Sequence, residues 1–343
     1  FFQKYKIFSF LVLFHIILCS IMARILTGIQ SSGKPHLGNI LGAIEPSIKL
    51  SQNSENESLF FIADLHSLIN IKDSQLRKEN TISVAAAWIS MGFDYKNNFF
   101  YRQSKIQEVC ELNWYLNCFT PFPMLSNSHS YKDKSNNLSS INAGLFTYPI
   151  LMASDILLYD ADIVPVGKDQ KQHLEITRDI AKSFNHEYGE TLVVPESKID
   201  NKVMTIPGID GRKMSKSYEN TMDVFENENI LKKQIMSIVT DSKGIEEKKT
   251  PNNCNVFNLY KLIADDSEII RMKENYEKGN YGYGHAKKEL FDLVIEKYKK
   301  PRSKYFELIK NRDHIHKILV QGEIKAKKIA CTVLERVRNK LGY

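Results

Sequence analysis

The sequence holds few of the residues that mark several common classes of protein. Its 343 residues include only 16 glycines and 10 prolines, too few for a collagen-like or a Pro/Gly-rich disordered chain. The five cysteines are an odd number, form no C-x-x-C pair and do not cluster with histidines at zinc spacing. A disulfide framework and a structural zinc site are therefore not expected, and reduced thiols are typical of a cytosol-like compartment. Hydrophobic residues at 43% and charged residues at 25% match a folded globular protein with one large domain, or a domain plus a smaller partner.

The first 22 residues include a long apolar run. Residues 7–22 read IFSFLVLFHIILCSIM behind two lysines, a pattern typical of a signal peptide or a short anchor. Two features favour an upstream translation artefact instead: the chain opens on Phe1 rather than methionine, and Met22 runs directly into a strand pattern without a linker. We expect Met22 to be the real start and residues 1–22 to be a non-native extension. An organellar or secretory leader is the alternative.

Short apolar runs alternate with helical patterns from Arg24 to about Tyr218. The strands are expected at 24–29, 59–63, 98–103, 163–166 and 192–195, and the helices at 37–50, 80–91, 149–159 and 170–184. Residues 59–63 form a continuous apolar run of the kind found in buried parallel strands, and Pro149 suits the first turn of its helix. This alternation predicts a doubly wound parallel α/β sheet whose ligand lies beyond the carboxyl ends of the strands.

The strand pattern stops near Tyr218, and the remaining residues are expected to be helical. The expected helices span 230–239, 256–264, 289–298, 304–309 and 325–341. Residues 287–343 carry sixteen lysines and arginines against seven aspartates and glutamates, so a net charge of +9 gathers there and about −2 is left for the rest. Such a segment indicates a polyanion partner or a solvated helical face. We therefore predict an α/β domain over 23–212 and an all-α domain over 213–343.

A glycine-rich turn follows the first expected strand. Residues 28–34 (GIQSSGK) match the G-x-x-x-x-G-K of a P-loop, but a P-loop continues with Ser or Thr to bind magnesium, and Pro35 has no hydroxyl. The turn continues instead as His36-Leu37-Gly38-Asn39. A histidine at the mouth of a helix can donate a hydrogen bond to phosphate oxygens, which the amides of a helix N-terminus already favour. Gly38 would let a purine lie against the helix backbone.

A second motif, residues 213–217 (KMSKS), lies about 175 residues further along the chain. Its two lysines would bring ammonium groups to a loop that also offers backbone amides. A mobile basic loop can stabilise charge that develops on a transferring phosphoryl group, although K-x-x-K alone is usually a solvated patch.

Together the two motifs resemble the signature pair of class I aminoacyl-tRNA synthetases. The wider pattern T-G-I-Q-x-x-G…H-L-G-N is similar to the bacterial type of their tryptophanyl branch, and the resemblance runs from about Arg24 to the C-terminus, more loosely in the helical part. Asn39 stands where most of the class carries a second histidine, but Asn is common in this branch; Ser31 stands where proline is frequent. The resemblance implies a Rossmann-like catalytic domain of the HUP type and an anticodon-binding helical domain.

The amino-acid pocket is expected on the helix at 149–159. Tyr148, Met152 and Asp155 fall at i, i+4 and i+7 and so share one face. A carboxylate among apolar residues is costly unless it accepts a hydrogen bond, and the indole N–H is a donor only. A cap or salt bridge within the core is the alternative role for Asp155. The resemblance favours tryptophan over the runner-up, tyrosine, because tyrosyl enzymes carry Gln at the position of Met152.

The resemblance also assigns the other candidate site residues. Those expected to bind ATP are Gln30, Ser31, Ser32, Gly38, Asn39, Gly167, Lys168, Asp169, Val203, Lys213, Met214, Ser215, Lys216 and Ser217. Those expected to bind tryptophan are Tyr148, Met152, Asp155, Val164, Val166, Gln170 and His66. The groups expected to act in catalysis are His36, Asn39, Lys134, Lys213 and Lys216. His66 could equally be a core histidine, and the charge run around Lys134 could equally be solvated.

The implied activity is ATP-dependent attachment of L-tryptophan to tRNA(Trp) through a tryptophanyl-adenylate, with release of diphosphate and AMP. Mg²⁺ would arrive on ATP, because no carboxylate cluster for a metal site is visible. The resemblance further implies a homodimer, and we expect a cytoplasmic location without a membrane partner. Two alternatives of other classes stay open: a nucleotidyltransferase of the same fold with no tRNA substrate, and a membrane-tethered or exported binding protein.

Overall fold

The computed structural model describes residues 23–53, 55–128, 131–132, 141–167, 170–196 and 206–343. The expectations for the extension at 1–22 and for Lys134, Lys168, Asp169 and Val203 lie outside these residues. Within them, no helix has the length and apolar character that crossing a membrane requires.

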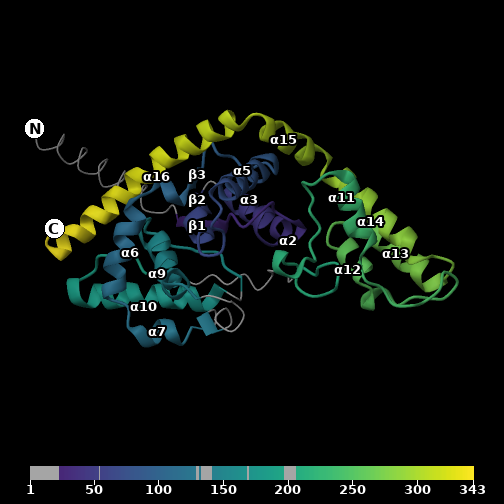
Figure 1. Cartoon of the computed structure of the whole chain (residues 1–343), viewed down its shortest axis with the longest axis horizontal. Coiled ribbons are helices and arrows are strands. Elements are labelled where there is room, and N and C mark those ends of the chain that lie inside the picture. Colours follow the sequence, from purple (N-terminus) through teal and green to yellow (C-terminus); the bar gives the residue numbers. More distant parts are fainter. Residues whose placement is uncertain (1–22, 54, 129–130, 133–140, 168–169, 197–205) are drawn as a thin grey trace, which may run out of the picture.

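Three parallel strands form the centre of the molecule (Figure 1): β1 (Ala23–Gln30), β2 (Asn56–Ala63) and β3 (Phe99–Arg102), in the order β1-β2-β3. Two single bridges extend the sheet beyond β1, since Ile163 pairs in parallel with Ile25 and with Glu196. Read from β3 outward, the order is therefore that of a doubly wound sheet. The predicted Rossmann-like α/β fold with a helical C-terminal part is confirmed.

The expected strands at 163–166 and 192–195 are wrong in extent: in the described residues these segments have isolated bridges instead of strands, at Ile163 and Val166 in the first and at Glu196 directly after the second. Ile163 exchanges backbone hydrogen bonds with Arg24 and Leu26. Two residues further along, the next donor that could face β1 would belong to Pro165, which has no N–H. The ladder therefore stops after one bridge.

Helices cover both faces of the sheet. The connection from β1 to β2 is one continuous helical segment of α2 (Leu37–Asn39), a π-helical turn (Ile40–Ile44) and α3 (Glu45–Ser51). The other helices of this part are α4 (Asp64–Ser67), α5 (Ser74–Ser90), α6 (Glu108–Cys118), α7 (Phe122–Ser126), α9 (Ala143–Leu157) and α10 (Lys171–Tyr188). Along β2 the side chains alternate between two cores: Phe60 packs with α5, and Phe61 packs with α9 and α10.

Two helices begin earlier than the sequence pattern indicates. Asp73 caps α5 by accepting a hydrogen bond from the Leu76 N–H, so that helix starts well before residue 80. Asn142 caps α9 in the same way through the Leu145 N–H. Pro149 consequently lies inside α9, and its predicted position in the first turn is wrong. In both cases a polar cap residue, not the apolar pattern, sets the start.

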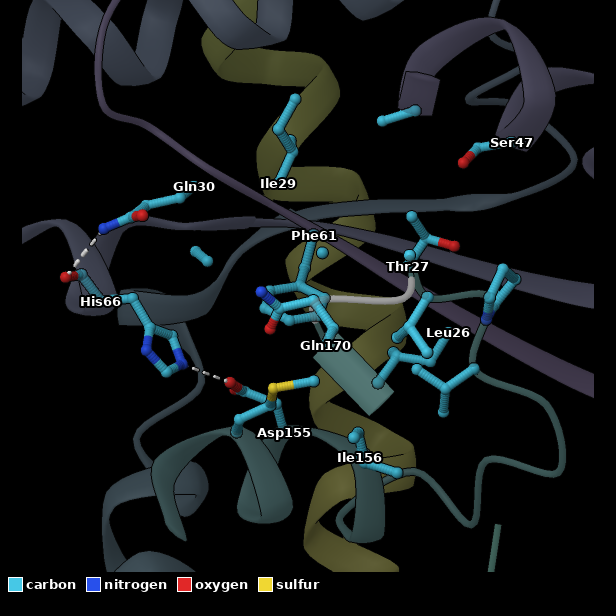
Figure 2. Close-up of a pocket in the computed structure, with 18 of the residues that line it drawn as sticks. Leu26, Thr27, Ile29, Gln30, Ser47, Phe61, His66, Asp155, Ile156 and Gln170 are labelled. Carbon is cyan, nitrogen blue, oxygen red and sulfur yellow. Dashed lines mark hydrogen bonds and ion pairs between the residues drawn. The ribbon is translucent and has the colours of Figure 1, made fainter. Parts of the chain in front are cut away.

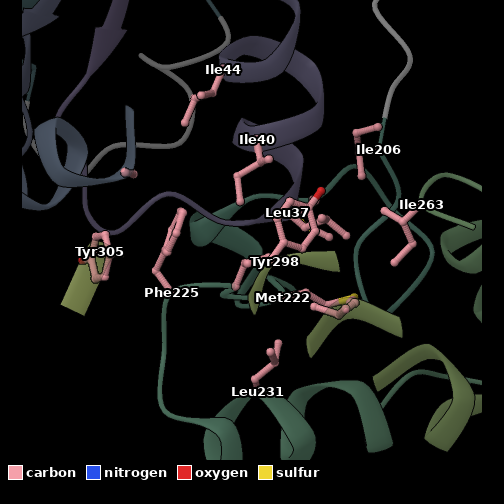
Figure 3. Packing of buried hydrophobic residues seen from close by; sticks show 14 of the residues in the cluster. Leu37, Ile40, Ile44, Ile206, Met222, Phe225, Leu231, Ile263, Tyr298 and Tyr305 are labelled. Carbon is pink, nitrogen blue, oxygen red and sulfur yellow. The ribbon is translucent and has the colours of Figure 1, made fainter. Parts of the chain in front are cut away.

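After residue 222 the chain consists of helices and loops, with a long loop between residues 237 and 250. Its helices are α11 (Glu228–Met236), α12 (Asn255–Tyr260), α13 (Asp266–Lys278), α14 (Tyr283–Lys297), α15 (Lys299–Lys310) and α16 (Arg312–Leu341). The mostly polar α13 was not expected. A shared hydrophobic cluster (Figure 3) joins Leu37 of α2 with Met222 and Tyr298, so the helical part packs against the segment that follows β1.

The long α16 returns across the molecule to the α/β part (Figure 1) and packs on β3 and α6. The approach is so close that a Cβ atom at Gly322 would lie 1.9 Å from the carbonyl oxygen of Phe100. Ion pairs fix the helix further along, with Arg102–Glu323 at 2.5 Å and Arg338–Glu111 at 2.7 Å. The outer edge of the sheet is therefore covered by the most C-terminal helix.

Candidate active site

A cavity of about 410 Å³ lies beyond the carboxyl ends of β1 and β2 (Figure 2), where a doubly wound sheet binds its ligand. The predicted site residues that line it are Gln30, His66, Tyr148, Met152, Asp155, Val164, Val166, Gly167 and Gln170. They come from the end of β1, from α4, from α9 and from the segment after the Ile163 bridge. The structure thus brings together the whole set assigned to the amino acid.

Asp155 is the buried acid of this cavity. It is 2% exposed, and His66 Nε2 lies 3.1 Å from its Oδ2 atom. Because a carboxylate only accepts hydrogen bonds, the Nε2 atom of His66 carries the proton. Gln103 Nε2 donates to both oxygens of Asp155, at 2.9 and 2.7 Å. Burial raises the pKa of the Asp155 carboxyl, and the hydrogen bonds from His66 and Gln103 oppose that rise.

Two more polar groups are held at the edges of the cavity. Gln30 Nε2 donates to the backbone oxygen of His66 at 3.2 Å (Figure 2), which ties the end of β1 to α4. The Tyr148 hydroxyl lies 2.5 Å from Nε2 of the buried His173, which fixes the direction of the phenol. Between these polar groups the walls are apolar and include Met152, Val164 and Val166.

The two signature motifs meet beside the start of α2. The backbone N–H of Gly38 points at the sulfur of Met214 at 3.2 Å. The side chain of Lys216 lies over Gly33, where an added Cβ would come within 2.9 Å of the Lys216 ammonium. Gly33 also has a φ of +136°, a conformation that favours glycine. Residues about 180 positions apart in the sequence thus form one group.

Two titratable side chains lie where the motifs meet, His36 and Lys216, and the pKa of each is lowered. Burial, together with the charge of Lys216, lowers the pKa of His36 to about 4, so this imidazole is neutral at pH 7. Burial lowers the pKa of Lys216 to about 8. The His36 Nδ1 atom is buried and meets no hydrogen-bond partner in the described part of the chain. A neutral histidine with an unused ring nitrogen and a neighbouring lysine form a pair of donors that suits phosphate oxygens.

Asn220 holds the second motif in shape. Its side chain is 1% exposed, accepts from the Ser215 N–H at 2.7 Å and donates to the Lys213 carbonyl at 3.1 Å. The same amide donates to Asp210 at 2.7 Å. The ends of the loop are therefore fixed from inside, while Lys213 and Ser217 are exposed.

Some predicted ATP-binding residues lie away from the cavity. Ser31 is fully buried, and its hydroxyl pairs with that of Ser67 at 2.9 Å. Ser32 and Ser215 do not line the cavity either. Asn39 turns its side-chain oxygen back to accept the His36 N–H at 3.1 Å, which caps the start of α2. The roles assigned to these residues in ATP binding stay predictions.

Sequence reasoning missed several residues of the site. Gly28 lies close against Phe61, because an added Cβ would lie 2.4 Å from the ring. Its place in the glycine-rich turn was the sequence signal for this residue. Thr27 and Ser47 also line the cavity. Gln103, the partner of Asp155, had only a weak signal as a polar residue directly after an apolar strand. Within the described ranges, no three His, Cys, Asp or Glu side chains are grouped to hold a metal ion.

Comparison with known proteins agrees with this geometry. Residues 22–299 match the family model for class I tRNA synthetases (W and Y), and the chain belongs to that family. A tryptophan–tRNA ligase of Campylobacter jejuni is 46% identical over 319 residues, which cover 93% of this chain and 99% of the relative. One from Fusobacterium nucleatum is 44% identical over 94% of this chain and 98% of its own.

A solved structure has the same fold. The crystal structure of Campylobacter jejuni tryptophanyl-tRNA synthetase, complexed with ADP and tryptophan, superimposes with a TM-score of 0.89 at 46% identity. The match covers 93% of this chain and 100% of the solved one.

Proposed function

We propose that the chain is a tryptophan–tRNA ligase, which activates L-tryptophan with ATP and transfers it to tRNA(Trp). The observation that carries the specificity is Asp155, a 2%-exposed carboxylate that lines the cavity at the carboxyl ends of the strands, beside the apolar side chains of Met152, Val164 and Val166. The relatives that match nearly the whole chain are named for the same reaction.

The shape and chemistry of the cavity favour the indole ring. The indole N–H is a donor with no acceptor capacity, and a buried carboxylate is a strong acceptor. Met152 and Val164 provide apolar contact for a flat ring. A phenylalanine side chain would offer no donor to the Asp155 carboxylate, so the acceptor that faces the cavity would gain no hydrogen bond from that ligand, and a site built to accept one rejects it strongly.

The first chemical step is adenylate formation. A carboxylate oxygen of tryptophan attacks the α-phosphorus of ATP, the bond to the bridging oxygen breaks, and diphosphate leaves with the electron pair. Lys213 and Lys216 are proposed to stabilise the charge on the phosphates, and neutral His36 to donate a hydrogen bond to them. The chain thereby contributes positioning and charge rather than a covalent nucleophile.

The second step transfers the aminoacyl group. A hydroxyl of the 3′-terminal ribose of tRNA attacks the carbonyl carbon of the adenylate, and AMP leaves. The basic helices after residue 286 are proposed to contact the anticodon arm, mainly through phosphates, with unstacked bases providing specificity.

Magnesium, the oligomeric state and the location are part of the same proposal. Mg²⁺ prefers phosphate oxygens and water, and we propose that it binds through ATP.

A homodimer is supported by large apolar side chains on consecutive helices: Trp114 of α6 is 67% exposed and Phe122 of α7 is 69% exposed. Large aromatic side chains are enriched at subunit interfaces. A cytoplasmic location fits the absence of a disulfide framework in the composition.

The test is ATP–diphosphate exchange with tryptophan and with tyrosine, comparing the wild type with Asp155→Asn. We expect tryptophan-dependent exchange, and a loss of roughly 100-fold in kcat/KM for tryptophan in the variant because a charge-assisted hydrogen bond disappears. Asp73→Asn is the matched control, since Asn also caps helices and Asp73 does not line the cavity. Exchange with tyrosine instead would overturn the assignment of Asp155 and Met152.

A further inference from the structure

Gln103 lies directly behind the buried acid of the cavity. It follows β3 at the carboxyl edge of the sheet, is 1% exposed and does not line the cavity itself. Its Nε2 atom donates to both oxygens of Asp155, at 2.9 and 2.7 Å. Gln103 therefore acts on the ligand side through its neighbours, above all through the carboxylate of Asp155.

The orientation of the Gln103 amide is fixed from its other end. Its Oε1 atom accepts the backbone N–H of Leu65 at 3.1 Å. A flipped amide would turn its oxygen toward the carboxylate and its NH₂ toward another donor, which loses every one of these hydrogen bonds. The NH₂ group must therefore face Asp155.

The same segment also holds the helix that carries His66. Ser104 donates to Asp64 of α4 through its backbone N–H at 2.8 Å and through its hydroxyl at 2.5 Å. Together with the bond from Leu65 to Gln103, these contacts fix α4 to the end of β3. Both donors to Asp155, the Gln103 amide and the His66 ring, are thus set by one short segment.

We propose that Gln103 is a positioning and specificity residue that orients the Asp155 carboxylate, so that an oxygen lone pair faces the indole N–H of the substrate. This inference rests on the proposed function and extends it to a residue outside the cavity. The neutral Gln103 amide donates two hydrogen bonds to the Asp155 carboxylate and brings no positive charge to it. A cation in that place would form an ion pair with the carboxylate and compete with the indole for it.

The test compares the wild type, Gln103→Met and the control Ser237→Ala in ATP–diphosphate exchange. Methionine has a similar length and no amide, whereas Ser237→Ala removes one side-chain hydrogen bond at the end of α11, outside the segment that sets Asp155 and His66. We expect KM for tryptophan to rise roughly 10- to 100-fold in Gln103→Met, because the acceptor is no longer aligned. KM for ATP and the behaviour of Ser237→Ala should change little.

A tryptophan analogue separates positioning from general loss of structure. In 3-benzothienylalanine a sulfur atom replaces the indole N–H, so it cannot use the Asp155 acceptor. The ratio of kcat/KM for tryptophan over this analogue should fall in Gln103→Met by about the same factor as tryptophan loses. A variant that is merely destabilised would lose activity with both substrates and keep the ratio.

Gln103→Glu gives a second, independent measurement if the methionine variant does not fold. A protonated Glu can donate one hydrogen bond to Asp155 in place of the two from the amide, whereas two ionised carboxylates repel. KM for tryptophan in this variant should therefore rise steeply from about pH 6 to about pH 8.5, and the wild type should not share this slope. The other titratable groups that face Asp155 are His66, Asp64, Tyr101, Tyr159 and Cys110. They are the same in both proteins.

The outcomes distinguish a failure of the inference about Gln103 from a failure of the proposed function. If the wild type exchanges with tryptophan but Gln103→Met keeps its KM and its ratio, or Gln103→Glu lacks the slope, Gln103 is only structural and the inference is wrong. If the wild type shows no tryptophan-dependent exchange, the proposed function itself is wrong and this inference falls with it.

Discussion

The cavity around Asp155 and the loop around Lys216 hold their polar groups in opposite ways. In the cavity, the acid is 2% exposed and both of its oxygens accept hydrogen bonds from buried neighbours. In the loop, Lys213 and Ser217 are exposed, and the fixed element is Asn220 beneath them. A rigid, dehydrated acceptor suits a choice between amino acids, while charges on a surface loop can follow phosphates whose geometry changes during the reaction.

Among the variants that test this comparison, we expect Lys216→Ala to have the largest effect on activity. The proposed role in charge stabilisation predicts a loss of roughly 100- to 1000-fold in kcat for ATP–diphosphate exchange. KM for tryptophan should stay within about twofold, because the cavity does not contain this lysine. Lys317→Ala on α16 is the charge-matched control. A rise in KM for tryptophan without a loss in kcat would show that the two regions are not separate.

A pH experiment sharpens the comparison through His36. Its pKa is lowered to about 4 in the folded protein, while the unfolded chain keeps the ordinary value of 6.5. Above pH 6.5 both states are neutral and the stability is fully present; as the pH falls toward 4, only the unfolded state gains the proton, so stability is lost. Between pH 7.5 and 5 this loss amounts to about 2 kcal/mol. Urea unfolding should show that much less pH dependence in His36→Asn than in the wild type.

The smallest of the three effects is expected for Asn220→Ala. It leaves the Ser215 N–H and the Lys213 carbonyl without their buried partner, so the loop adopts its present shape less often. We expect kcat for exchange to fall by about 10-fold while KM for tryptophan is unchanged. Asn229→Ala on the exposed side of α11 serves as the control. An equal rise in KM for tryptophan would mean that the loop and the cavity are coupled.

Much of the fold could be predicted because its signals are local. The continuous apolar run at 59–63 becomes the buried C-terminal part of β2, and the stop of strand patterns near Tyr218 marks the start of the helical part. Two of the failures trace to a single residue: Asn142 moves the start of α9, and Pro165 ends the pairing after Ile163. The helix α13 was missed because its sequence is mostly polar.

The site residues also divide into those that local spacing predicts and those that it does not. The face shared by Tyr148, Met152 and Asp155 follows from helical spacing, and the structure places all three on the cavity. The meeting of the two motifs came from a family resemblance, since nothing local to Gly38 points to Met214. Gln103 escaped prediction because its bonds join residues 38 and 52 positions away, and no spacing rule covers such a contact.

The contact between α16 and β3 also has a consequence for synthesis on the ribosome. Arg102 of β3 and Glu323 of α16 are separated by 221 residues. At ordinary elongation rates the outer edge of the sheet stays bare for roughly 10 to 45 s after β3 has been made. An uncovered strand edge can pair with other chains, so this interval is when the nascent protein is most exposed to aggregation and most in need of a chaperone.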